Sequence, residues 1–442
     1  MKKILHNISL HAVHSSGRIV GQFRNSRIYV DGGISGEIVN VELDRVQRGY
    51  RYGKVTEVVQ ASPYRVQPFC KHYGICGGCM WQHIAYEEQL RLKREILQNA
   101  LQKYEIDTPE IPQVKASPLQ QGYRNKSEYT FAAAAFDKHP FCLGFHVGEH
   151  RSQVCQIDEC FLQSPIVQQI ADAVQKLAIE NNFSFYDYPL RNGLLKSLQL
   201  RTTTTGQLLL CLDCMREDER IKSFLQKIIS FFPVISSCFY LIDRGEPIHV
   251  FGETHLTERS GNLFFSYSPM SFYQPNPTQA EELCKIVTQY ANLSGNELVY
   301  DLYTGIGSLA IHIANDAAAV IGIEGNAVAI ADAQYNAKAN GIKNTRFFVG
   351  DILHTFNDEF INSHGRPDVV ILDPPRFGTL IEIKKTILRA APKKIIYVSC
   401  NPVSLAFDLK QLSEKYRVTA IQPLDMFPHT HHVETIALLE KK

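Results

Sequence analysis

The chain has 442 residues, of which 45% are hydrophobic and 21% are charged. This mixture is that of an ordinary globular protein, and it excludes disordered, collagen-like and coiled-coil classes. The length predicts two or three domains. The apolar stretches are too short or too interrupted to predict a membrane span, and the first residues do not resemble an export signal, so we expect a cytoplasmic protein.

The charge is unevenly distributed along the chain. Residues 1–130 contain 18 Lys and Arg against 12 Asp and Glu, whereas the rest contains 28 against 33, and the net charge is +1. A basic N-terminal region on a nearly neutral protein indicates a polyanionic partner, most plausibly nucleic acid. A basic solvated face without a partner is the alternative explanation of the charge.

Residues 15–60 have the pattern of short strands joined by tight turns. Residues 28–30 are β-rich and are followed by Asp-Gly-Gly, and residues 37–43 alternate with period two. This pattern predicts a small five-stranded barrel of the OB type, a fold that often binds oligonucleotides. Beyond it we expect a helix over residues 86–104 and a β-rich central region with a helix near residues 166–180. We place the domains at residues 1–61, 62–270 and 271–442.

The last third of the chain alternates between short apolar strands and helices. The strands are expected at residues 298–302, 320–323, 346–349, 369–372 and 395–398, with helices such as 308–314 and 327–340 between them. This alternation predicts an α/β fold with a parallel, doubly wound, Rossmann-like sheet. In such sheets ligands bind at the carboxyl ends of the strands.

The loop after the first of these strands contains two glycines, in Asp-Leu-Tyr-Thr-Gly-Ile-Gly (residues 301–307). Glycines here permit a tight turn and a close approach of the backbone to a ligand. Glu324 ends the next strand, where a carboxylate accepts hydrogen bonds from ribose hydroxyls. Asp351 follows the third strand and either reaches an adenine amino group or is a plain turn residue. Ala310 stands where a dinucleotide-binding loop has a third glycine, which still permits NAD, but the whole constellation favours S-adenosylmethionine.

Two further strands end in residues suited to methyl transfer. Asp373 follows the fourth strand, in Leu-Asp-Pro-Pro-Arg, and Cys400 follows the fifth, in Val-Ser-Cys-Asn-Pro. A thiolate that adds to C6 of uracil gives C5 the carbanion character that it needs to attack a methyl group. Asp373 is placed to hydrogen-bond the uracil imide edge and to steady the enolate. Glu434, at the start of the last strand, is the candidate base for the C5 proton.

Other interpretations of these residues remain open. A lone cysteine at a strand end is more often a buried thiol. Asp-Pro-Pro also suits methylation of an exocyclic nitrogen, but that reaction leaves Cys400 and Glu434 without a role, and Arg376 replaces the aromatic ring that usually stacks on the base. A binding protein without activity is a third possibility, against which the intact glycine loop argues. The histidines of residues 429–432 have no carboxylate-rich partner that would indicate a metal site.

Together these motifs resemble the S-adenosylmethionine-dependent RNA uracil-5-methyltransferases. The resemblance covers most of the chain and includes Tyr-Val-Ser-Cys-Asn-Pro (397–402) and Asp-Met-Phe-Pro-His-Thr-His-His-Val-Glu (425–434). It implies S-adenosylmethionine as the methyl donor, Cys400 as nucleophile and Glu434 as proton acceptor, with Asp373 assisting. The cofactor contacts that we expect are Gln274, Tyr303, Gly305, Ser308, Glu324, Asp351 and Asp373.

The front of the chain resembles the ribosomal-RNA branch of that family. Residues 17–59 look like a TRAM domain, an RNA-binding module, and Cys70, Cys76 and Cys79 look like ligands of an iron–sulfur cluster. The resemblance implies a [4Fe–4S] cluster with Cys160 as fourth ligand and Cys155 as the alternative; zinc would use the same thiolates. The transfer-RNA branch typically lacks both features, so we expect the product to be 5-methyluridine in 23S ribosomal RNA. The alternatives are the same chemistry on tRNA, or an iron–sulfur RNA-binding protein without turnover. We also expect a monomer.

Overall fold

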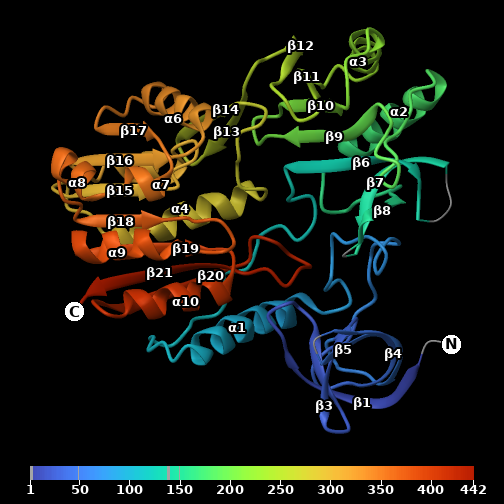
Figure 1. Cartoon of the computed structure of the whole chain (residues 1–442), viewed down its shortest axis with the longest axis horizontal. Coiled ribbons are helices and arrows are strands. Elements are labelled where there is room, and N and C mark those ends of the chain that lie inside the picture. The colour runs from blue at the N-terminus through green and yellow to red at the C-terminus, as the bar shows by residue number, and fades with distance from the viewer. Residues whose placement is uncertain (1–2, 48, 137–139, 149) are drawn as a thin grey trace.

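The computed structural model describes residues 3–47, 49–136, 140–148 and 150–442, and its chain forms three parts (Figure 1). The N-terminal part is a small β-barrel, and the middle part is a seven-stranded mixed sheet. The C-terminal part is a second seven-stranded sheet with helices on both faces. In Figure 1 the C-terminal sheet lies on the left, with the central sheet above the barrel on the right. The predicted α/β class is therefore confirmed.

The N-terminal barrel is closed, with the strand order β1-β2-β3-β5-β4. Its first strand lies before the segment in which the sequence pattern predicts strands. Register shifts between Leu5 and Ile8 and after Leu10 interrupt the period-two alternation of this strand, which is why the pattern does not reveal it. The strands are β1 (Ile4–Val13), β2 (Ile19–Phe23), β3 (Ser26–Asp31), β4 (Ile38–Gln47) and β5 (Tyr50–Gln60).

Helix α1 (Tyr86–Lys103) connects the barrel with the C-terminal part. Leu92 and Ile96 pack into the core of the barrel. Leu97 and Leu101 pack into the core on one face of the C-terminal sheet. Lys93 lies between these two contacts and is fully buried. One helix therefore joins two cores that are far apart in the sequence.

The central sheet has the strand order β12-β11-β10-β9-β6-β7-β8, and only β10 and β11 are parallel neighbours. Helices α2 (Pro165–Glu180) and α3 (Arg220–Phe231) share a core with it. A separate hairpin, β13 (Leu256–Ser260) with β14 (Leu263–Tyr267), packs against the C-terminal part. The sheet strands are β6 (Lys126–Ala134), β7 (Pro140–Val147), β8 (His150–Gln156), β9 (Leu195–Thr202), β10 (Leu208–Cys214), β11 (Ser237–Ile242) and β12 (Ile248–Gly252).

The C-terminal sheet has the order β17-β16-β15-β18-β19-β21-β20. Its first five strands are parallel, as predicted, whereas β21 is antiparallel to both of its neighbours. The connection between β20 and β21, residues 425–433, is shorter than the dozen or so residues that a parallel crossover needs. The strands are β15 (Leu298–Leu302), β16 (Ala319–Glu324), β17 (Thr345–Val349), β18 (Val369–Leu372), β19 (Lys394–Ser399), β20 (Tyr416–Leu424) and β21 (Glu434–Lys441).

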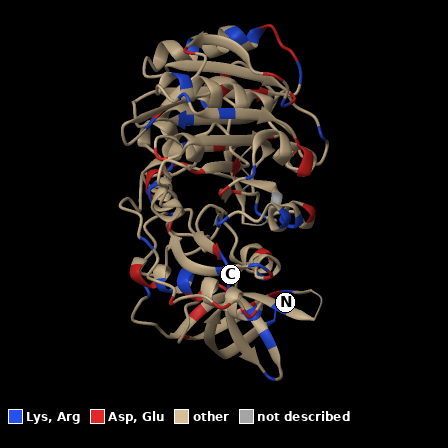
Figure 2. Ribbon diagram, turned by 90° about the vertical axis from the view of Figure 1, so that its left-hand side faces the viewer, with Lys and Arg blue, Asp and Glu red and all other residues tan. Residues whose placement is uncertain are grey.

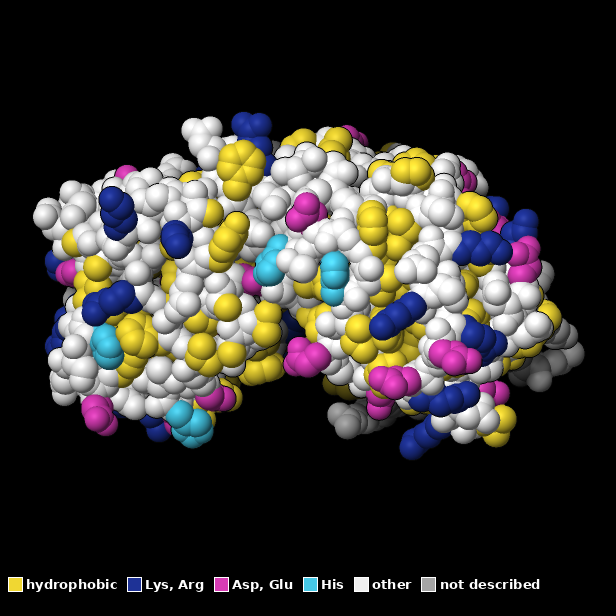
Figure 3. Space-filling model, turned by 90° about the horizontal axis from the view of Figure 1, so that it is seen from above, with side chains coloured by type: hydrophobic (Ala, Val, Ile, Leu, Met, Phe, Trp, Pro, Cys, Tyr) yellow, Lys and Arg dark blue, Asp and Glu magenta, His cyan; other side chains and the backbone are white. Residues whose placement is uncertain are grey.

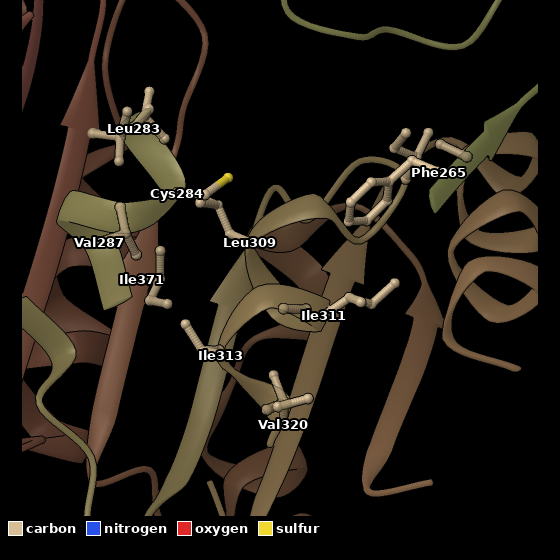
Figure 4. Close-up of a cluster of buried hydrophobic side chains, with 14 of the residues drawn as sticks. Phe265, Leu283, Cys284, Val287, Leu309, Ile311, Ile313, Val320 and Ile371 are labelled. Carbon is tan, nitrogen blue, oxygen red and sulfur yellow. The ribbon is translucent and has the colours of Figure 1, made fainter. Parts of the chain in front are cut away.

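Helices cover both faces of this sheet. One face carries α4 (Pro277–Ala291), α5 (Ser308–Ala314) and α6 (Ala327–Ala339). Figure 4 shows Cys284 of α4 next to Leu309 of α5 in that core. The other face carries α1 together with α7 (Ile352–Thr355), α8 (Asp358–His364), α9 (Ile381–Ala390) and α10 (Pro402–Leu412).

Basic and acidic residues are interspersed along the ribbon of the barrel, as they are in the rest of the molecule (Figure 2). Arg18 pairs with Asp31, and Arg65 pairs with Glu37, so part of the positive charge of the N-terminal region is neutralised within the protein. Exposed apolar side chains are scattered over the face in Figure 3 rather than gathered in one patch. Among the described helices, none has the length and apolar character needed to cross a membrane.

Candidate active site

The carboxyl ends of β15, β16, β18 and β19 lie side by side, because these strands are parallel neighbours. The register pairs the last residues of β15 with those of β16 and β18. Tyr303, Glu324, Asp373 and Cys400, which end or directly follow these strands, therefore emerge at one edge of the sheet. The expectation that they share a crevice follows from this register.

The glycine loop after β15 depends on left-handed backbone conformations. Tyr303, Gly305 and Gly307 have φ angles of 67°, 55° and 82°. A Cβ atom on Gly307 would also lie 3.1 Å from that of Ala333, so glycine is needed there for conformation and for space. The Gly305 N–H donates to Oε2 of Glu324 over 3.3 Å and holds that carboxylate at the end of β16.

A cavity lies between the glycine loop, α4 and the segment that precedes α4. Glu324 lies beside this cavity through its bond to the glycine loop. Asp351 is not among the lining residues of this cavity, and its Oδ1 accepts the N–H of Leu353 at 2.8 Å and caps α7. This is the turn role that the sequence left open for it. The predicted cofactor residues that line the cavity are Gln274, Tyr303, Gly305, Ser308 and Asp373.

Two residues of this site are missed by sequence reasoning. Asn125, which precedes β6 of the central sheet, donates from Nδ2 to the carbonyl of Gln274 at 3.1 Å and so holds one wall of the cavity. Asp301 is buried, lines the cavity and accepts a hydrogen bond from Thr304 on Oδ2 at 2.6 Å. Its other oxygen, Oδ1, is buried without a hydrogen-bond partner among the described residues. The only sequence signal for Asp301 is its place at the start of the glycine motif.

The charge of this cavity fits S-adenosylmethionine. Burial raises the pKa of Asp301 to about 7. Burial, and secondly the charge of Asp301, raises the pKa of Asp373 to about 7. Burial disfavours the charged forms of both carboxyl groups, and a cation bound next to them would favour the charged forms. The sulfonium and ammonium groups of S-adenosylmethionine would supply this positive charge.

Cys400 and Glu434 meet beside Asp373. Strand β21 pairs with β19 so that Ser399 lies opposite Thr435, which places Cys400 and Glu434 at adjoining ends of the two strands. Glu434 is buried, whereas Cys400 is partly exposed. The structure thus brings together the three residues that the sequence predicts to be catalytic.

The environment of these groups favours their protonated forms. Burial, and secondly the charge of Glu434, raises the pKa of the Cys400 thiol to about 11. Burial also raises the pKa of Glu434 well above its ordinary value, and Asp373 adds to this effect. Arg376 acts in the opposite direction on both pKa values. Its position is fixed, because Asn401 Nδ2 donates to its carbonyl at 2.8 Å.

The loop of residues 425–433, which leads into Glu434, is held by other parts of the chain. Lys93 of α1 forms a fully buried ion pair with Asp425, and its Nζ also donates to the carbonyl of Phe427 at 2.9 Å. The backbone N–H groups of Met80 and Trp81 both donate to the carbonyl of His429 at 3.0 Å. The segment that contains the clustered cysteines therefore touches the loop that positions the candidate base.

The clustered cysteines line a second cavity, of about 260 Å³. Cys70, Cys76, Cys79 and Cys160 all face it. Cys155 is buried beside Phe145, to whose carbonyl its thiol donates at 3.4 Å. The cavity is far larger than the roughly 10–15 Å³ that one water molecule needs. Burial raises the pKa of Cys79 to about 12 and that of Cys160 to about 11.

No ligated single metal ion is indicated at these cysteines. In residues 3–47, 49–136, 140–148 and 150–442, no three His, Cys, Asp or Glu side chains converge as ligands of one ion. A four-iron cluster holds its thiolates farther apart than a single ion does, and four thiols around one large cavity are the donor set that such a cluster uses. Thiolates serve as ligands of both zinc and iron–sulfur clusters, so the donor chemistry of this cavity permits a cluster.

Comparison with known proteins identifies the family. A sequence model described as tRNA (Uracil-5-)-methyltransferase matches residues 85–442. The chain belongs to this RNA uracil-5-methyltransferase family. An RNA methyltransferase of Bacteroides thetaiotaomicron is 40% identical over 451 residues, which cover 96% of this chain and 99% of the relative. One of Porphyromonas gingivalis is 37% identical over 440 residues, which cover 93% and 95%. The protein is thus an RNA methyltransferase with the S-adenosylmethionine-dependent fold.

A solved structure is similar to the methyltransferase over its whole length. It is the tRNA (uracil-54, C5)-methyltransferase of Pyrococcus abyssi in complex with S-adenosyl-L-homocysteine, with 26% identity and a TM-score of 0.77. The match covers 99% of this chain and 100% of the other. Because a tRNA enzyme shares the overall architecture, barrel region included, the barrel does not distinguish a ribosomal from a transfer RNA substrate. The sequence argument for 23S ribosomal RNA loses that support.

Proposed function

We propose that the enzyme transfers a methyl group from S-adenosylmethionine to C5 of a uridine in 23S ribosomal RNA, through a covalent bond between Cys400 and C6. The observation that carries the chemistry is the meeting of Cys400 with Glu434 beside Asp373, which lines the cofactor cavity. A nitrogen methyltransferase has no use for this pair. We also propose that the enzyme acts as a cytoplasmic monomer.

Each residue has a separate part in the reaction. The Cys400 thiolate adds to C6 of the uracil, and the electron pair of the C5–C6 double bond moves toward C5 and O4. Asp373 steadies the ring through its imide edge. S-Adenosylmethionine supplies an electrophilic methyl group, which C5 takes while the sulfur keeps the bonding electrons. Glu434 then removes the C5 proton, the double bond re-forms, and Cys400 leaves as the thiolate.

In the free site the surroundings favour the protonated forms of both groups, so Cys400 and Glu434 must each lose a proton before they act. Because burial raises the pKa of Cys400 to about 11, the thiol is protonated at neutral pH. Cys400 is partly exposed, so its proton passes to bulk water when the substrate binds. Arg376 is the cation that favours the thiolate. Glu434 must be ionised when it accepts the C5 proton, and Arg376 favours that form too. Arg376 therefore lowers the cost of both steps.

We further propose that Cys70, Cys76, Cys79 and Cys160 hold a [4Fe–4S] cluster, and that the barrel binds RNA as a TRAM domain. The four thiols around one cavity support the first proposal. Cys160→Ser is expected to remove iron and the visible absorbance of the purified protein, whereas Cys238→Ser, which changes a buried thiol of β11 outside this cavity, keeps both. Stoichiometric zinc without iron would contradict the cluster.

The choice of substrate is open to a direct test. The cysteine motif favours 23S ribosomal RNA through its resemblance to that branch, and the whole-chain similarity to a tRNA methyltransferase favours tRNA as the second candidate. Unmodified transcripts of both RNAs would be incubated with methyl-labelled S-adenosylmethionine and digested to nucleosides. Label in 5-methyluridine from the ribosomal transcript alone is the expected result. Label from tRNA alone would reject the proposed substrate and keep the chemistry.

A further inference from the structure

Phe377 is a strongly exposed aromatic residue on a rigid turn. Its side chain is 70% exposed. The turn is closed by the N–H of Gly378, which donates to the carbonyl of Pro375 at 2.8 Å. The preceding carbonyl, that of Arg376, accepts hydrogen bonds from Asn401 at 2.8 Å and from Ser404 at 3.1 Å. The backbone that carries the ring is thus fixed on both sides.

This turn belongs to the active site. It follows Asp373 directly, and Arg376 is close enough to Cys400 and Glu434 to lower the pKa of both. The hydrogen bond from Asn401 ties the turn to the residue that follows the nucleophile. The turn that carries the exposed Phe377 ring therefore adjoins the site to which the target uracil must come.

Exposure of this degree is uncommon among the phenylalanines of the protein. The two most exposed in the described ranges are Phe377, at 70%, and Phe272, at 68%, and Phe272 lines the cofactor cavity. Phe407, which is 47% exposed, packs against the ring of Tyr104. Within the described part of the chain, the Phe377 ring makes no such ring contact. One of the two most exposed phenylalanines thus lies in the cofactor cavity, and the other lies on the turn that Asn401 holds next to Cys400.

We propose that Phe377 is a stacking platform for a base of the RNA substrate next to the target uridine. A uridine that leaves its stack to reach Cys400 exposes the faces of its neighbours, and an aromatic side chain beside the site replaces the lost contact. Base–aromatic stacking tolerates any base, so this contact adds affinity without sequence specificity. The proposal rests on RNA as the substrate of the proposed function, but it does not depend on which atom is methylated.

The direct test is fluorescence of a tryptophan placed at the turn. Phe377→Trp adds an exposed indole, whereas the natural Trp81 is buried. Phe231→Trp is the matched control, because Phe231 is 57% exposed and ends α3, far from the C-terminal sheet (Figure 1). Each variant would be titrated with unmodified tRNA and 23S transcripts in the presence of S-adenosylhomocysteine. Binding would be followed in parallel by the anisotropy of labelled RNA.

We expect the fluorescence of the Phe377→Trp variant to be quenched by the RNA that binds, and that of the Phe231→Trp variant to remain unchanged. Phe377→Ala is expected to weaken RNA binding about 5- to 150-fold, with no change in S-adenosylmethionine affinity. RNA that binds without quenching the Phe377→Trp variant, or binds Phe377→Ala as tightly as wild type, would overturn the proposal. Absence of 5-methyluridine in the wild-type product would reject the proposed reaction instead, because the binding readouts do not need turnover.

Discussion

The cofactor cavity and the cysteine cavity are built in different ways. In the first, Tyr303 and Asp373 directly follow neighbouring parallel strands, and the register of one sheet places them. In the second, Cys79 and Cys160 come from loops in different parts of the chain, which meet through packing between the barrel, the central sheet and the C-terminal part. The first site depends on one sheet, whereas the second depends on how several parts pack together.

The two regions also meet. The segment just after Cys79 donates two hydrogen bonds to the carbonyl of His429, five residues before Glu434. The buried ion pair between Lys93 and Asp425 holds the start of the same loop, residues 425–433, against α1. The chemistry of the first region is therefore expected to respond to damage in the second, although no cysteine of the cluster lies in the cofactor cavity.

The largest effect is expected from the nucleophile. Cys400→Ala should reduce methyl transfer to background, since no other group supplies the electron pair that activates C5. Cys238→Ala is the control, because Cys238 is a buried thiol in β11 of the central sheet. Initial rates with labelled S-adenosylmethionine measure both. Substantial activity in Cys400→Ala would contradict the role of Cys400 as the nucleophile.

The second-largest effect is expected on the free energy of unfolding when the buried ion pair between Lys93 and Asp425 is removed. Lys93→Met leaves Asp425 buried without its partner, which costs about 3–5 kcal/mol of unfolding free energy. Arg389→Ala removes an exposed pair with Asp358, for which we expect about 0–1 kcal/mol. Urea unfolding compares them. Equal stabilities of the two variants would show that the buried pair does not hold the loop.

The pH dependence of cofactor binding tests whether the ionised carboxyl groups of the cofactor cavity attract S-adenosylmethionine. Burial raises the pKa values of Asp301 and Asp373 to about 7, so acid protonates these groups and removes their attraction for a cationic ligand. From pH 8 to pH 6, affinity for S-adenosylmethionine should fall about tenfold for each carboxyl group that must be ionised. Calorimetry at several pH values measures this, and Asp301→Asn should flatten the profile. A flat wild-type profile would contradict the charge argument.

The smallest effect is expected on cofactor binding when Asn125, which holds one wall of the cofactor cavity, is changed. Asn125→Ala removes the hydrogen bond to the Gln274 carbonyl, which is worth about 1 kcal/mol. The KM for S-adenosylmethionine should rise about fivefold, while kcat at saturation changes little. Steady-state kinetics separates the two constants. A loss confined to kcat would place Asn125 in the chemistry rather than in cofactor binding.

Sequence patterns reveal the parts of the molecule whose geometry is local. The alternation of strands and helices predicts the parallel strands, and with them the shared edge of Tyr303, Asp373 and Cys400. The bulged strand β1 has no regular alternation, and nothing near Lys93 in the sequence indicates that its partner is Asp425. Asp301 and Asn125 are missed for a related reason. Burial at the cavity gives Asp301 its role, and a hydrogen bond to Gln274, a residue far away in the sequence, gives Asn125 its role.

The most direct test of the account is to trap the bond between protein and RNA. In Glu434→Gln the C5 proton is not removed, so the methylated adduct between Cys400 and C6 should accumulate as a denaturation-resistant protein–RNA species. Digestion and mass spectrometry should then find a methylated uridine on the peptide that contains Cys400. Free 5-methyluridine at the wild-type rate, or an adduct on any other residue, would contradict the roles assigned to Cys400 and Glu434.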